Sequence, residues 1–244
     1  MNLRLAIILA ALLGASKACP AAPTNDFFAC GLELSHAGQF PEAAAAFEES
    51  GKQRPAVGTL VNLGLAEWQR GHAGAAVLAW EQALWIDPFD ARAADNLNFA
   101  RQVAEVAAPP LKWYEAISVW LPANAWLWLA AGSFWLAVAL LLLPRVFRRR
   151  RTGWQQWLAA LSFSVFLFSL TANVGVVSRT QIGFVLKKNA PLLLTPTRDA
   201  EVIIPLAAGE PARAQRIRGD YVFVRTQGAA GWLDRRDFGL ISSR

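Results

Sequence analysis

The spacing of apolar residues divides this 244-residue chain into three stretches of different character. Up to about residue 106, apolar and small residues recur every three or four positions, which predicts amphipathic helices. Two long runs, 126–143 and 157–177, follow without a charged residue. Beyond Ser178 the apolar runs are short and alternate with Gly, Pro and Asn turn signals, which predicts strands. We therefore expect a multi-domain protein with an all-α unit, two membrane-length helices and a small all-β unit.

One set of residue types occurs twice in the helical stretch, at an offset of 33 positions. Each copy has a glycine in its first helix, a glycine at the turn, a small alanine and a bulky aromatic in its second helix, and a terminating proline. The glycines allow close packing and a positive φ, and the proline stops the helix. The positions that define the repeat are Gly31, Gly38, Ala43 and Phe47 in the first copy and Asn62, Gly64, Gly71, Ala76, Trp80 and Ala83 in the second.

This pattern resembles the tetratricopeptide (TPR) repeat, a helix–turn–helix unit with a usual period of about 34 residues. The resemblance implies that residues 23–106 stack into a repeat domain, with 91–106 as its capping helix. Stacked repeats present a concave surface to another protein, so the repeat residues are also candidates for a partner-binding surface. Ordinary amphipathic helices are the plainer alternative.

The N-terminus has a charged start at Arg4, an apolar run too short to span a bilayer and a small-residue exit. We interpret 1–22 as a secretory signal peptide, cleaved after Ala18 or Ala21. Lipidation of Cys19 and an uncleaved anchor are the alternatives. The chain has two cysteines and no disulfide framework or zinc spacing, and cleavage beyond Cys19 would leave Cys30 unpaired. We expect Cys30 to be a small core residue.

The two uncharged runs predict transmembrane helices at 126–144 and 157–178, each long enough to cross roughly 30 Å of hydrocarbon. The connecting loop, 145–156, contains five arginines, which favours a cytoplasmic position. Both flanks then lie on the outer side of a bacterial inner membrane, in agreement with the signal peptide. A helical hairpin buried in a soluble core is the alternative.

Two segments near the membrane carry further patterns. Aromatic and apolar residues recur at helical spacing in 107–125, which predicts either a helix lying in the outer interface or a fourth helix on the repeat stack. Ser162, Ser169 and Asn173 share one face of the second span. We expect that face to meet the first span or a partner's span, against the alternative that both serines bond their own backbone.

Charge is unevenly distributed along the chain, whose net charge is +6. The arginine loop accounts for nearly all of it, so no nucleic-acid partner is expected. Residues 23–110 hold five basic and eleven acidic side chains, whereas 179–244 hold eleven basic and six acidic ones. This opposition predicts that the C-terminal unit docks loosely on the repeats; two surfaces that ignore each other are the alternative.

The C-terminal stretch, 179–244, contains short apolar runs between turn signals, which predicts a small barrel. The runs that we interpret as strands are 184–186, 191–194, 201–204, 213–217, 221–225 and 231–233. Its segments 208–211, 219–224 and 228–233 resemble a bacterial SH3 domain. Gly231 and Trp232 are the most specific pair in that match. The resemblance implies an SH3-like fold for this unit.

The order of these parts resembles the BatE-like proteins of aerotolerance operons. The most specific local matches are 62–64, 80–88 followed by 95–97, and 231–233. The resemblance implies an envelope protein that works beside membrane-anchored von Willebrand factor A-type proteins and a MoxR-type ATPase in an aerotolerance or stress complex.

The sequence contains no phosphate loop, nucleophile elbow or dinucleotide fingerprint. Neither His36 nor His72 has a carboxylate at metal-ligand spacing. We therefore expect no enzyme and no cofactor. Two functions remain: a scaffold for protein partners, and a cell-wall-binding module whose barrel holds peptidoglycan.

Overall fold

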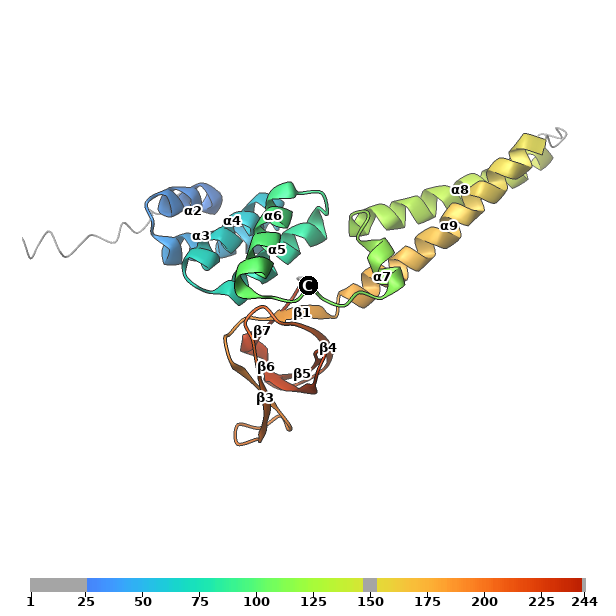
Figure 1. Ribbon diagram of the computed structural model, residues 1–244. Helices are drawn as coiled ribbons and strands as arrows, with labels where there is room; N and C mark the ends of the chain where they lie inside the picture. The colour runs from blue at the N-terminus through green and yellow to red at the C-terminus, as the bar shows by residue number, and fades with distance from the viewer. Residues whose placement is uncertain (1–25, 147–152, 243–244) are drawn as a thin grey trace, which may run out of the picture.

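The computed structural model describes residues 26–146 and 153–242. The predicted signal peptide and most of the arginine loop lie outside these residues. The described chain forms eight α-helices and one antiparallel seven-stranded sheet, which confirms the mixed helical and all-β architecture. Five helices gather on one side, a long helical hairpin extends away from them, and the sheet lies below the place where the two meet (Figure 1).

The first five helices pack each against the next along the chain. They are α2 (Phe27–His36), α3 (Phe40–Gln53), α4 (Val57–Gln69), α5 (Ala73–Ile86) and α6 (Ala91–Ala104). The 33-residue offset is present in the structure, because α3 and α5 begin and end at matched positions. The turns before these two helices contain Gly38 and Gly71 at φ +75° and +79°, a backbone region that strongly favours glycine.

Two long helices form the hairpin. Both α8 (Ala123–Val146) and α9 (Gly153–Arg179) are long and apolar enough to cross a membrane. On α9, Ser162 and Ser169 are buried within the hairpin, and each hydroxyl also donates to a backbone carbonyl of its own helix at 2.8 Å. The sequence left two alternatives for these serines, burial against another helix and hydrogen bonding to their own backbone. In the structure the serines are buried and also bond their own backbone.

The segment before the hairpin contains a single short helix, α7 (Trp113–Ser118). It packs against α9, where Gly175 lies so close to the Tyr114 carbonyl oxygen that a side chain on the glycine would collide with it. The prediction of a fourth helix packed on the repeat stack was therefore wrong. Trp113, the first residue of α7, and Trp120, which follows the helix, are largely exposed.

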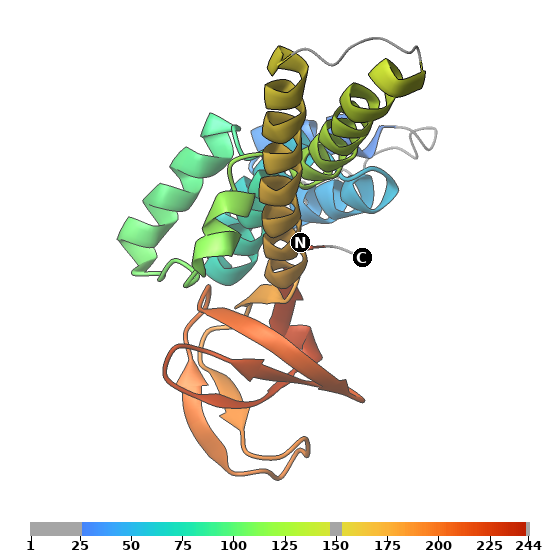
Figure 2. The ribbon, with the colours of Figure 1, turned by 90° about the vertical axis from the view of Figure 1, so that its right-hand side faces the viewer.

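The C-terminal unit is one antiparallel seven-stranded sheet in the order β3-β2-β6-β5-β4-β1-β7, which curls round on itself and is called the barrel below (Figure 1). The strands are β1 (Ile182–Val185), β2 (Ala190–Leu193), β3 (Val202–Leu206), β4 (Pro211–Arg218), β5 (Tyr221–Arg225), β6 (Ala230–Asp234) and β7 (Phe238–Leu240). Its interior holds Leu192, Val224 and Leu233 with almost no exposed surface. Figure 2 shows that α9 runs directly into β1, so the second long helix and the barrel are continuous.

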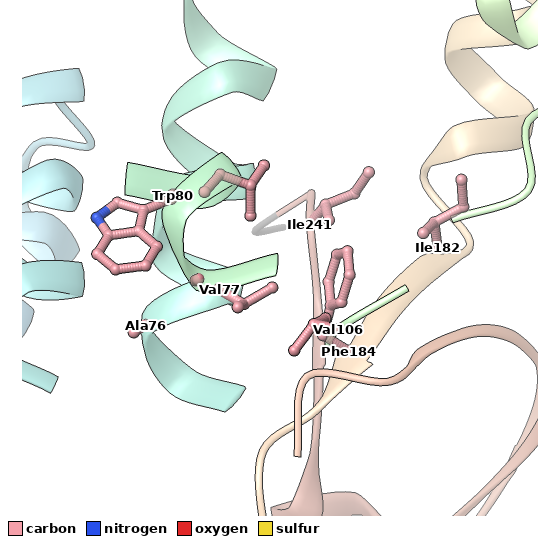
Figure 3. Close-up of a cluster of buried hydrophobic side chains, with 9 residues drawn as sticks. Ala76, Val77, Trp80, Val106, Ile182, Phe184 and Ile241 are labelled. Carbon is pink, nitrogen blue, oxygen red and sulfur yellow. The ribbon is translucent and has the colours of Figure 1, made fainter. Parts of the chain in front are cut away.

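The barrel packs tightly against the helical repeats through an apolar core. One buried cluster contains Val77 and Trp80 of α5 together with Ile182 and Phe184 of β1 and Ile241, which follows β7. Within it, the Trp80 indole points away from the barrel residues (Figure 3). The loose, charge-driven docking expected from the sequence is thus replaced by close packing. Burial of this apolar surface drives the contact, and opposite net charge is a secondary effect.

Backbone approaches across the same contact are very close. A side chain at Gly74 of α5 would collide with the Val185 carbonyl oxygen, and one at Gly239 of β7 would collide with Leu78. The Gln82 amide also donates to the Leu240 carbonyl oxygen at 2.9 Å. These contacts fix the orientation of the barrel on α5 as well as its attachment.

Candidate functional site

The repeat-defining residues form the interior of the helix stack. Side chains built at Gly31 would come within 2.6 Å of the Phe47 ring, and side chains at Gly64 would collide with the Trp80 indole. Each aromatic ring therefore lies directly over the glycine that matches it in the repeat. Ala43, Ala76 and Ala83 are fully buried beside them.

The remaining predicted positions also serve the backbone or the packing. The Asn62 amide donates to the Gly58 carbonyl oxygen at 2.8 Å, and the Trp80 indole N–H donates to the Val61 carbonyl oxygen at 3.2 Å. Because these residues are internal or bonded to the backbone, a partner must contact other side chains of the stack. The sequence pattern identified how the repeats are built but missed the residues they expose.

One exposed apolar face lies on the first helices of the repeat units and on the capping helix. The rings of Trp68 on α4 and Phe99 on α6 meet edge to face at 5.7 Å. Leu65 lies one helical turn before Trp68, Val103 lies one turn after Phe99, and both are exposed, as is Phe99. These four residues form the first-helix face, which could have been found as apolar residues left over after the repeat positions were assigned.

A groove of about 610 Å³ lies on the opposite side, between the second helices α3 and α5 and over α4. The barrel contributes Leu186 and Ile241 to its lining. The apolar helix residues in the lining are Phe47, Leu60, Leu63, Leu78, Trp85 and Ile86. This composite groove could not be found from the sequence, because repeats and barrel form it together.

A polar junction joins α7, α9 and the barrel. The Glu115 carboxylate of α7 is fully buried and accepts two hydrogen bonds from the Arg213 guanidinium of β4, at 2.6 and 2.8 Å. It also accepts from the Ser178 hydroxyl at 2.5 Å and from the Lys112 backbone N–H at 2.8 Å. Burial by itself raises the pKa of Glu115, but the bonds from Arg213, Ser178 and Lys112 outweigh it and lower the pKa to about 2.

The end of α9 connects this junction to the repeats. The Arg179 guanidinium lies over the Trp85 ring of α5, 4.9 Å from its centroid, and donates to the Ser118 hydroxyl at 3.4 Å. Nearby, Glu81 of α5 accepts from Arg101 of α6 at 2.7 Å. Burial raises the pKa of Glu81, and the positive charges of Arg101 and Arg179 oppose that rise. The last residue of the second long helix thus touches the repeats and α7 together.

The two marker residues of the barrel, Gly231 and Trp232, are consecutive positions of β6. A side chain at Gly231 would come within 2.7 Å of the Leu193 carbonyl oxygen, so the glycine permits β2 to approach β6. The Trp232 ring meets Phe223 edge to face, with centroids 5.3 Å apart. The β2–β3 hairpin next to them exposes Leu194 and Val202.

The titratable side chains do not form a metal centre. Among the described residues, no group of three His, Cys, Asp or Glu side chains could hold a metal ion. His72 instead lies 2.7 Å from the buried carboxylate of Glu67, which also pairs with Arg70 at 2.5 Å. The sequence did not reveal this pair.

Cys30 is disulfide-bonded, a bond that its expected role as a small core residue did not include. It lies in the apolar cluster between α2 and α3, beside Leu34 and Phe47. Disulfides persist in oxidising compartments, so the bond fits a position outside the cytoplasm.

Comparison with known proteins adds no relative: no protein-family model, curated protein or solved structure matches this chain.

Proposed function

We propose that this protein is a non-enzymatic scaffold of the bacterial envelope, anchored in the inner membrane by the α8–α9 hairpin. Its TPR-type repeats and its SH3-like barrel lie on the periplasmic side and bind protein partners. The observation that carries the proposal is the matched packing of Gly31 under Phe47 and Gly64 under Trp80, which is the geometry of stacked helix repeats. By the BatE resemblance, von Willebrand factor A-type membrane proteins of an aerotolerance or stress complex are the expected partners.

The proposed binding surface for such a partner is the first-helix face. It offers aromatic side chains at Trp68 and Phe99 flanked by exposed Leu65 and Val103. Exposed aromatic clusters of this kind are typical of protein interfaces, where they contribute most of the binding energy.

The experiment places a photoreactive amino acid at Phe99 and, as a control, at Glu42 on the exposed face of α3. Crosslinking in intact membranes should capture a defined partner from position 99 and not from position 42. With the photoreactive residue at position 99, the double substitution L65D/V103D should abolish capture in a protein that keeps its fold. Deleting the repeats is a poorer test, because it would expose Ile182 and Phe184 of the barrel.

A second candidate function, binding of the cell wall through the barrel, is favoured by one observation. The 179–244 region is basic, and its β2–β3 hairpin exposes Leu194 and Val202. Isolated peptidoglycan should then retain the protein. Loss of that retention on substitution at Trp232, together with unchanged retention in L65D/V103D, would favour this function over the scaffold.

A further inference from the structure

We infer that the groove between α3 and α5 binds an amphipathic partner segment that carries large apolar side chains and basic residues. This inference deepens the proposed scaffold function and rests on it. It concerns a surface different from the first-helix face, on the opposite side of the repeats.

The size and lining of the groove support the apolar part of this assignment. Its volume of about 610 Å³ is within the range of binding sites for whole ligands and is far larger than a packing defect. The floor is formed by Leu60 and Leu63 of α4, and one wall by Leu78, Trp85 and Ile86 of α5. An amphipathic helix or strand buries its apolar side chains in grooves of this kind.

The charge of the rim supports the basic part. Glu48 lines the groove, is exposed and has no ion-pair partner among the described residues. Lys52, the basic residue of the same rim, is compensated by Glu49 at 3.3 Å. The helical side of the groove belongs to a region, 23–110, with six more acidic than basic side chains, whereas the barrel side belongs to 179–244, which has five more basic than acidic ones, so the acidic rim is the helical one. A segment with Lys or Arg therefore complements the rim, and an acidic segment is repelled.

The barrel limits how the segment lies. Leu186 and Ile241 contribute to the lining, and Gln82, also in the lining, is held by its bond to the Leu240 carbonyl oxygen. An occupant therefore contacts the repeats and the barrel together. At Trp85 it would also contact the ring on which Arg179 of the second long helix lies.

Gly51 provides a selective way to block the groove. It lies in α3 and lines the groove, and a side chain built there meets only Thr59 Cγ2 at an ordinary 3.9 Å. Gly51→Leu should therefore fill the groove without strain, and it replaces a residue that is unfavourable inside a helix. Glu48→Lys reverses the rim charge. Glu42→Lys makes the same charge change on α3 outside the groove and is the matched control.

The test uses the full chain in zwitterionic nanodiscs and two labelled amphipathic peptides, one of leucine and lysine and one of leucine and glutamate. Empty nanodiscs correct for binding to lipid, and fluorescence anisotropy measures affinity. The leucine–lysine peptide should bind, and the leucine–glutamate peptide should bind at least about tenfold more weakly. G51L and E48K should each weaken binding by about tenfold, whereas E42K should leave it unchanged.

Equal binding to the wild type and to G51L would overturn the inference, and equal losses in E48K and E42K would overturn the role of the rim charge. Failure of the groove assignment can be distinguished from failure of the proposed scaffold function. If crosslinks from position 99 persist in G51L while the peptide does not bind the wild type, the groove assignment fails and the scaffold proposal stands. If peptide binding behaves as expected without any crosslink from position 99, the first-helix face is the part that fails.

Discussion

Glu115 and Arg213 are 98 positions apart in the sequence, yet their side chains form a two-point ion pair in which the carboxylate is fully buried. Glu115 belongs to the helix that packs on the second long helix, and Arg213 belongs to the barrel. The pair therefore joins the hairpin to the barrel at a point where the chain itself also passes from one to the other.

Removing one partner of this pair should destabilise the junction. E115A leaves the Arg213 guanidinium facing a void, and we expect it to lower the free energy of unfolding by roughly 3 kcal/mol. Thermal or denaturant unfolding in nanodiscs measures the loss. R216M, which removes an exposed arginine from the same strand, should change stability by less than about 0.5 kcal/mol. The double variant E115L/R213M should recover part of the loss; a double variant less stable than either single one would contradict this account.

The same pair predicts a specific pH dependence. The pKa of Glu115 is lowered from 4.5 to about 2, so its contribution to stability is complete above the unfolded-state value and is lost as pH falls from about 4.5 toward 2. The unfolding temperature should therefore fall through protonation of Glu115 only in acid, and this pair should cause no change near neutral pH. The E115Q variant should lack the acid-dependent component. A junction that loosens near pH 6 in the wild type would refute the prediction.

The two repeat glycines should be intolerant of even a methyl group. G64A forces the Trp80 indole to move, and G31A does the same to Phe47, so each should cost about 1–3 kcal/mol of unfolding free energy. G51A, in a helix position with ordinary space, should instead be neutral or stabilising by up to about 1 kcal/mol. In the G64A/W80F double variant the smaller ring should relieve part of the G64A cost. Strict additivity of the two changes would mean that the glycine and the ring do not interact.

The proposed topology gives a further prediction. Alkaline phosphatase fused after Arg244 should be active, because the barrel lies outside, whereas a fusion between Arg148 and Arg151 should be inactive. Fusion protein levels, measured by immunoblot, control for degradation. An inactive C-terminal fusion on a stable protein would reverse the proposed orientation.

The interactions that the sequence predicted well are local ones. The helices of the repeats, the two long apolar helices and six of the seven strands all have counterparts in the structure. The turn glycines Gly38 and Gly71 were predicted because positive φ is a property of a single residue. The missed strand, β7, follows a short 3₁₀ turn and has three residues, too few to show a period. Only its pairing with β1 makes it a strand.

The candidate binding surfaces likewise depend partly on local sequence patterns and partly on contacts between distant segments. The sequence by itself determined the periods, the turns and the apolar lengths, because these depend on residues within one or two turns of each other. The tertiary structure alone decided that Val77 and Phe184 share a core, that Glu115 meets Arg213, and that Leu186 closes a groove on the repeats. Such contacts depend on how distant segments approach in space, and the same local pattern is compatible with many approaches. Only the simultaneous burial of all three parts selects one of them.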